Sequence, residues 1–128
     1  LLAAMGSDRS RFESAAEVQK YSGIAPVTER SGKHQWVHRR FACPKFVRQS
    51  FHEFAGQSIK FCVWARAYYD MKRGAGMGHQ AAVRALAYKW IRIIFRCWQD
   101  RIRYNEEIHL QSLRNKGSDV VNFMAKAA

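Results

Sequence analysis

A serine followed by a glycine opens the stretch of this chain whose residue types best suit chemistry. Residues 30–53 read RSGKHQWVHRRFACPKFVRQSFHE, and residues 30–48 hold six Lys or Arg, two His and no carboxylate. Glycine lets a backbone approach a ligand closely, and clustered cations attract a polyanion. The Ser31–Gly32 pair therefore suits binding or chemistry at phosphodiesters. A solvated basic loop with an ordinary turn explains the same residues about equally well, because Ser and Gly are common turn residues.

Composition narrows the class of protein. The chain has 128 residues, of which 48% are hydrophobic and 13% aromatic, so one domain with a real core is expected and disorder is not. Its net charge of +12 indicates nucleic acid or another anionic surface as a partner. The apolar runs are short and are interrupted by Lys or Arg, so neither a membrane span nor a signal peptide is predicted.

Three cysteines, Cys43, Cys62 and Cys97, form no CxxC pair, and their odd number argues against a disulfide framework. Zinc binding together with His38 or His52 is not favoured, because the spacings match no structural zinc pattern. Buried free thiols in a reducing cytoplasm are the favoured interpretation.

Local signals predict the first elements. Residues 1–6 suggest the last turn of a helix that Gly6 closes, so the chain is expected to start inside a helix. Ser14 and Glu17 form a capping box, which predicts a helix to about Ser22 that stops at Gly23.

The next segment is expected to be non-helical. Residues 24–27 should be extended, because the residue before a proline disfavours the helical region. Residues 28–42 are predicted to form an irregular loop or a short hairpin, with residues 35–38 as a strand. Pro44 suits the first turn of the following helix, where its missing N–H costs nothing.

Apolar residues recur at steps of three and four from Phe46 to Tyr69. This spacing predicts one long helix, or two helices broken near Gly56, ending at Arg73. The glycines of residues 74–78 are expected to connect it to the next helix as a flexible helical hairpin.

The clearest helix runs from His79 to about Asp100. Its apolar stripe consists of Val83, Leu86, Ala87, Trp90, Ile94, Cys97 and Trp98, widened by Tyr88, Ile91 and Phe95. A narrow basic line of Lys89, Arg92 and Arg96 remains, and a solvated helix face is its favoured interpretation.

A last helix is predicted from near Asn105, since Glu106 and Glu107 suit its positive end, and it should fade by Lys116. The expected fold is mainly α: a single small helical domain over residues 1–115, truncated at its N-terminus, with an irregular basic loop or short hairpin between the first and second helices. Residues 116–128 are expected to be a mobile tail.

The order of these motifs resembles the C-terminal domain of the insertion-sequence 110/116/902 transposases over about residues 1–115. That family typically shows G-D-x-x-x-F, a helix ending in Y-x-G-[LI]-x-P, a Ser-Gly pair, and a basic segment before L-R-x-x-[LF]-x-x-x-A. The matching residues are Gly6, Asp8 and Phe12, then Tyr21, Gly23, Ile24 and Pro26, then Ser31 and Gly32, and finally Val47, Arg48, Phe51 and Ala55. Where many members carry ISKxG, this chain has HRRFACPK.

The resemblance implies a two-part recombinase in the bacterial cytoplasm, an oligomer when complete. Its N-terminal domain carries acidic residues that bind Mg²⁺, and a bridge RNA pairs with the DNA. The C-terminal serine, here Ser31, would attack a phosphodiester and hold the strand as a phosphoserine. The ten carboxylates of this chain show no metal-binding cluster in sequence, so the resemblance places that metal and its acidic domain upstream, and the chain alone is expected to be inactive.

Five basic residues would contact phosphates of DNA or of the RNA–DNA duplex, namely Lys33, Arg39, Arg40, Lys45 and Arg48. His34 and His38 are interpreted as solvated loop residues rather than as bases, and Trp36 as a core residue or a base-stacking one. Two other functions remain open: a noncatalytic nucleic-acid-binding module, and a helical interaction domain whose charge only keeps it in solution.

Overall fold

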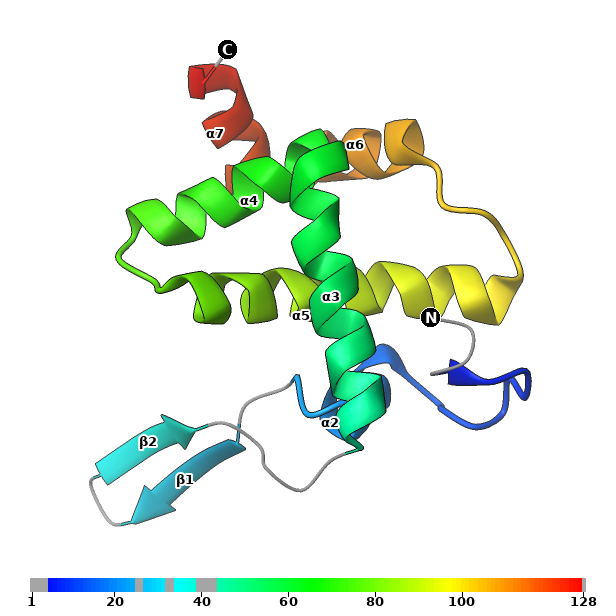
Figure 1. Ribbon diagram of the computed structural model, residues 1–128. Helices are drawn as coiled ribbons and strands as arrows, with labels where there is room; N and C mark the ends of the chain where they lie inside the picture. The colour runs from blue at the N-terminus through cyan, green and yellow to red at the C-terminus, as the bar shows by residue number, and fades with distance from the viewer. Residues whose placement is uncertain (1–4, 25–26, 32–33, 39–43, 128) are drawn as a thin grey trace.

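The computed structural model describes residues 5–24, 27–31, 34–38 and 44–127 (Figure 1). These residues form six α-helices and one antiparallel two-stranded hairpin, so the predicted mainly helical fold is confirmed. The elements are α2 (Ala15–Tyr21), β1 (Val27–Ser31), β2 (His34–His38), α3 (Lys45–Phe61), α4 (Val63–Gly74), α5 (His79–Asp100), α6 (Glu106–Asn115) and α7 (Asp119–Ala127).

Helix α5 is the central helix of the domain and contacts α2, α3 and α4. Figure 1 shows α3 crossing it, α4 running alongside it, and α2 on the side opposite α4. Helix α7 packs on α4, so α4 is covered on two sides. The hairpin projects from the helices at the same end of the molecule as the start of α3.

The core forms around the apolar stripe of α5, as its spacing predicts. The buried members are Val83, Leu86, Ala87, Trp90, Ile91 and Trp98, while Ile94, Phe95 and Cys97 are partly buried. Tyr88 was expected in this stripe but is 40% exposed. Successive residues of a helix are about 100° apart around its axis, so Tyr88 lies on a different side from the face that Leu86 and Trp90 share.

The break between the second and third helices lies at Cys62 and not near Gly56. Cys62 is extended, with φ −121° and ψ 118°, whereas Gly56 lies inside α3. A glycine within a helix costs only about 1 kcal/mol, so it does not force a break. The turn at Cys62 instead lets Trp64 enter the core, where it is 1% exposed and its indole N–H donates to Tyr104 Oη at 2.8 Å.

Helix ends differ from the sequence expectations by small amounts. Helix α4 ends at Gly74, one residue beyond the predicted end. Pro44 is the N-cap of α3 and does not lie in its first turn, because its ψ of 117° is extended. The capping box of α2 is confirmed in one half only: Ser14 Oγ accepts from the N–H of Glu17 at 3.4 Å, but the Glu17 carboxylate accepts from the N–H of Glu13 at 2.8 Å instead of from Ser14.

The glycine stops are confirmed where the chain leaves a helix. Met5 is helical and Gly6 follows it with φ +83°, and Gly23 follows α2 with φ +74°. Only glycine adopts such angles at little cost.

The chain after residue 116 does not form the mobile tail that the sequence predicts. Residues 119–127 form α7, and Val120 is 2% exposed against the rest of the core. Phe123 and Met124 join that contact at helical spacing. This segment is therefore a packed helix and not the predicted mobile tail, because its apolar stripe packs against α4.

Candidate nucleic-acid interface

The predicted Ser-Gly motif lies at the turn of the hairpin. The strands pair in antiparallel register, with Val27 opposite His38 and Ser31 opposite His34. Of the two forms that the sequence left open, a hairpin is therefore present. Ser31 is the last residue of its first strand, and His34 is the backbone partner across from it.

The predicted phosphate-binding residues fall into two groups. Lys33, Arg39 and Arg40 lie outside the described residues, as does Cys43. Lys45 is the exposed first residue of α3, and Arg48 lies one turn later and is partly exposed. Residues three apart on a helix lie on the same side, so these two cations form one short basic strip that begins where the chain returns from the hairpin.

Helix α3 is held rigidly behind this strip. Its residues Val47, Phe51 and Ala55 are buried in the core, where α3 packs against α5 and α4. The indole N–H of Trp90 donates to Ser58 Oγ at 2.9 Å, and that hydroxyl donates to the carbonyl of Ala55 at 2.6 Å. The core thus fixes the direction in which the first turn of α3 points.

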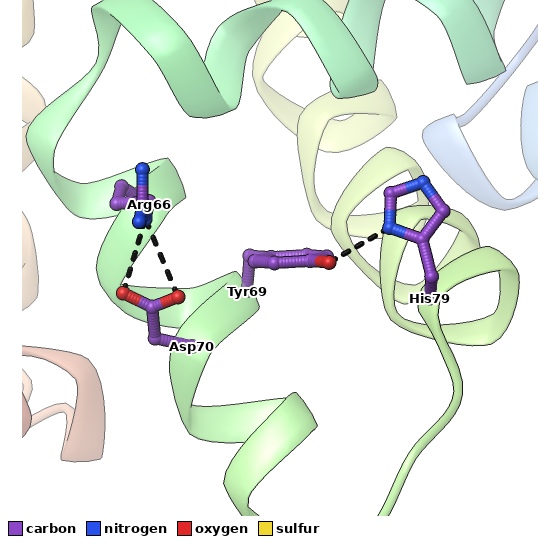
Figure 2. Close-up of polar contacts among 4 residues, drawn as sticks. All are labelled: Arg66, Tyr69, Asp70 and His79. Atoms are coloured by element: carbon purple, nitrogen blue, oxygen red, sulfur yellow. Dashed lines mark hydrogen bonds and ion pairs between the residues drawn. The ribbon is translucent and has the colours of Figure 1, made fainter.

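A second polar cluster joins α4 to α5. Figure 2 shows Tyr69 reaching from α4 to His79 at the start of α5, where Tyr69 Oη and His79 Nδ1 share a hydrogen bond of 2.7 Å. Arg66 and Asp70 form an ion pair of 3.1 Å along α4. A tyrosine and a histidine in contact can exchange a proton, but neither helix carries a predicted site residue. We therefore interpret the Tyr69–His79 contact as structural: it joins α4 to α5 across the glycine-rich turn.

The described thiols are unsuited to nucleophilic chemistry. Cys62 and Cys97 are free, as predicted, but they are only partly buried, which corrects the expectation of buried thiols. Burial and a hydrogen bond to Glu106, 3.1 Å from Sγ to Oε1, raise the pKa of Cys62 to about 11. Burial also raises the pKa of Cys97. Both side chains are thiols at neutral pH, whereas the thiolate is the reactive form.

The described residues do not fit a magnesium site. Within residues 5–24, 27–31, 34–38 and 44–127, no three His, Cys, Asp or Glu side chains are grouped as metal ligands. No step at a metal is therefore assigned to these side chains. In the same part of the chain, none of the helices is long and apolar enough to span a membrane.

Comparison with known proteins decides the family. Residues 1–70, more than half of the chain, match the sequence model of the Transposase IS116/IS110/IS902 family. The chain belongs to this family. All six predicted site residues lie in the matched segment, which contains the hairpin, α3 and part of α4.

Similar curated proteins come from insertion elements. A mini-circle protein of Streptomyces coelicolor, whose name marks it as the transposase candidate of IS117, is 33% identical over 107 residues, which is 84% of this chain and 26% of that protein. An uncharacterized 42 kDa protein of IS900 from Mycobacterium paratuberculosis is 31% identical over 81% of this chain and 26% of its own length. An uncharacterized 43.6 kDa protein of IS110 from S. coelicolor is 30% identical over 84% of this chain and 27% of its own length.

This family member thus spans about a quarter of the length of the relatives it matches. No solved structure matches the chain significantly.

Proposed function

We propose that this chain is the DNA-binding, serine-bearing C-terminal part of a transposase that acts in DNA transposition. The family match over residues 1–70 carries the proposal, because that segment contains both the Ser-Gly turn and the basic stretch leading into α3. The acidic, Mg²⁺-binding domain belongs to another part of the complete protein, and this chain alone is inactive. The complete enzyme is an oligomer that works in the bacterial cytoplasm.

Ser31 is the proposed nucleophile. Its hydroxyl oxygen forms a bond to the phosphorus of a DNA phosphodiester, and the bond from that phosphorus to one strand oxygen breaks. The departing strand oxygen takes up a proton and becomes a free hydroxyl end, while the other end stays attached as a phosphoserine. Attack by a hydroxyl end of the new strand then releases Ser31 and rejoins the DNA. A covalent intermediate of this kind divides one difficult step into two easier ones.

The basic residues of this segment position the nucleic acid. Lys33, Arg39 and Arg40 follow the serine closely in sequence, and Lys45 and Arg48 begin the rigid helix α3. Contacts of Lys and Arg to phosphates fix the register of a duplex without reading its bases. Their proposed partners are DNA and the RNA–DNA duplex formed with a bridge RNA.

Substitution of Ser31 in the complete transposase tests the nucleophile. Ser31→Ala should abolish strand exchange and leave nucleic-acid binding nearly unchanged, because a serine at a turn contributes little to the core. Ser31→Cys should keep at most a trace of activity. Ser50→Ala serves as the control, since Ser50 only donates to the carbonyl of Phe46 within α3, and it should recombine normally. Recombination assays and binding assays on the same preparations separate the two effects.

Full recombination by the Ser31→Ala variant would exclude Ser31 and favour a noncatalytic nucleic-acid-binding module. Loss of both recombination and nucleic-acid binding would instead indicate a damaged hairpin.

A further inference from the structure

Two lysines from different helices share one tyrosine ring. Lys72 Nζ lies 5.4 Å and Lys89 Nζ lies 4.8 Å from the centre of the Tyr68 ring. Tyr68 and Lys72 belong to α4 and Lys89 to α5, so the contact spans the seam between these helices. Tyr68 is 7% exposed, and its ring is therefore a fixed support and not a mobile surface residue.

Lys89 is also affected by other charges. Burial lowers the pKa of Lys89, and so do the positive charges of Lys72, Arg92 and Lys116, against one opposing carboxylate, Asp119. Burial lowers the pKa of His109, and the positive charges of Lys89 and Lys116 lower it further. We call Tyr68, Lys72 and Lys89, which are in contact, the Tyr68 cluster.

No described carboxylate forms an ion pair with Lys72 or Lys89, although Asp119 partly opposes the positive charge around Lys89. Arg66 forms an ion pair with Asp70 and Arg96 forms one with Asp100, and neither pair includes a cation of the cluster. The expected solvated basic line on α5 is thus divided. Arg96 is paired with a carboxylate, whereas Lys89 is partly buried and held against an aromatic ring.

Such an arrangement is unfavourable unless an anion completes it. Like charges repel more strongly where burial lowers the effective dielectric constant, and an ammonium loses hydration when it is partly buried. The Tyr68 ring attracts both ammonium groups, but it does not remove the repulsion between them. An anion with several oxygen atoms would contact these cations together and relieve that repulsion.

We propose that the Tyr68 cluster is a second contact surface for the phosphate backbone of nucleic acid. The inference rests on the proposed nucleic-acid binding and adds a surface apart from the hairpin: Figure 1 shows α4 and α7 on one side of α5, with α2 and the hairpin on the other. Lysines on flexible stems act as point charges, which suits phosphates spaced along a strand and gives no base specificity. The net charge of +12 suits a long polyanion such as nucleic acid.

The test measures how salt weakens DNA binding. The double variant Lys72→Met with Lys89→Met keeps the apolar stems and removes two charges. Its control is Lys20→Met with Arg103→Met, which removes two exposed charges that belong to neither the cluster nor the proposed hairpin interface. Fluorescence anisotropy with a labelled 20-base-pair duplex of mixed sequence would give the dissociation constant from low salt to physiological salt.

A plot of log affinity against log salt has a negative slope. For the cluster variant we expect this slope to become shallower by roughly 1.8, or about 0.9 for each lost phosphate contact. Affinity near 0.1 M salt should fall at least tenfold. The control should change much less. A Lys72→Arg, Lys89→Arg variant should keep the slope, and circular dichroism with thermal unfolding should show that every variant is folded.

The outcomes are distinguishable. An unchanged slope in a folded cluster variant would overturn this inference and leave the proposed function intact. Equal losses in the cluster variant and its control would show that only total charge matters, which also overturns it. Cluster-dependent binding of a poly-glutamate peptide without any effect on DNA would assign the surface to an acidic protein partner instead. If the unaltered chain fails to bind the duplex even at low salt, both proposals fail.

Discussion

At the scale of single residues, the Ser58 hydroxyl links α3 to α5 inside the core. It accepts the indole N–H of Trp90 at 2.9 Å and donates to the carbonyl of Ala55 at 2.6 Å, and Ser58 is 8% exposed. A buried donor that loses its partner costs free energy, because water cannot replace that partner. This one serine therefore contributes to the orientation of the helix that begins with Lys45.

Ser58→Ala should lower the free energy of unfolding by about 1 to 2 kcal/mol, because the Trp90 N–H would stay buried without an acceptor. The matched control is Ser50→Ala on the same helix, whose hydroxyl donates only to the carbonyl of Phe46. That variant should change stability by a few tenths of a kcal/mol at most. Urea unfolding followed by tryptophan fluorescence measures both, and equal effects would contradict the role assigned to Ser58.

Cys62 should react slowly with alkylating reagents. Burial and Glu106 raise the pKa of this thiol from 9.0 to about 11. This shift reduces the thiolate fraction at pH 8 roughly 100-fold, since each unit of pKa is a factor of ten. Iodoacetamide labelling of a Cys43→Ser, Cys97→Ser variant, followed by mass spectrometry, would measure the rate against that of free cysteine.

Glu106→Gln supplies the control for that experiment. The Glu106 carboxylate accepts a hydrogen bond from the thiol and repels the thiolate. Its neutral replacement should therefore lower the pKa of Cys62 and speed the labelling. A rate equal to that of free cysteine in the parent variant would contradict the assigned pKa direction.

At the scale of elements, the turn between α4 and α5 depends on one glycine. Gly76 has φ +96°, whereas Gly74 has an ordinary helical position at the end of α4. A Cβ at either position would meet no atom within 4 Å, so any difference between them comes from backbone conformation alone. The hydrogen bond between Tyr69 and His79 closes the same turn from the side (Figure 2).

Gly76→Ala should therefore destabilise the domain by about 1 to 2 kcal/mol, the cost of a left-handed conformation in a residue with a Cβ. Gly74→Ala should leave stability unchanged or raise it slightly, because alanine is the better helix former. Thermal unfolding of the two variants beside the unaltered chain gives the comparison. A loss of the same size in both would mean that backbone conformation is not the cause.

At the scale of the whole molecule, charge and family membership support binding, but the described residues do not form a complete catalytic centre. They do not fit a metal site, and the structure places Ser31 opposite His34 in the hairpin. Phosphoryl transfer needs charge stabilisation at the reacting phosphate, commonly from a metal held by carboxylates. Activity should thus require the remaining three quarters of a protein like its relatives.

The 128-residue chain alone should form no covalent adduct with DNA. The assay would incubate it with a matched, end-labelled DNA–RNA substrate and magnesium, and then separate protein–DNA adducts on a denaturing gel. Addition of an acidic domain from the same transposase in trans should produce an adduct that Ser31→Ala removes. An adduct formed by the chain alone would refute the two-part mechanism.

Local patterns in the sequence determine much of this domain. The bounds of α5, the capped starts of α2 and α6, and the glycine stops follow from neighbouring residues, and these predictions are confirmed. The family, too, is recognised from short motifs in a fixed order, which place Ser31 and the basic residues in one matched segment. Each helix end and each single motif depends on residues within a few positions of one another, and the order of the motifs can be read along the chain, so a linear pattern is sufficient.

Other features of the fold depend on contacts between residues that are far apart in the sequence, and only the tertiary structure shows them. The helix breaks at Cys62, where Trp64 contacts Tyr104 and Trp90, and α7 packs on α4. Lys89 belongs by spacing to a solvated face, yet the Tyr68 ring on another helix holds it partly buried. Helical spacing shows which side of a helix is polar, but only the packing of helices shows which polar side chains meet. The sequence therefore predicts the serine motif, whereas the Tyr68 cluster exists only in the folded domain.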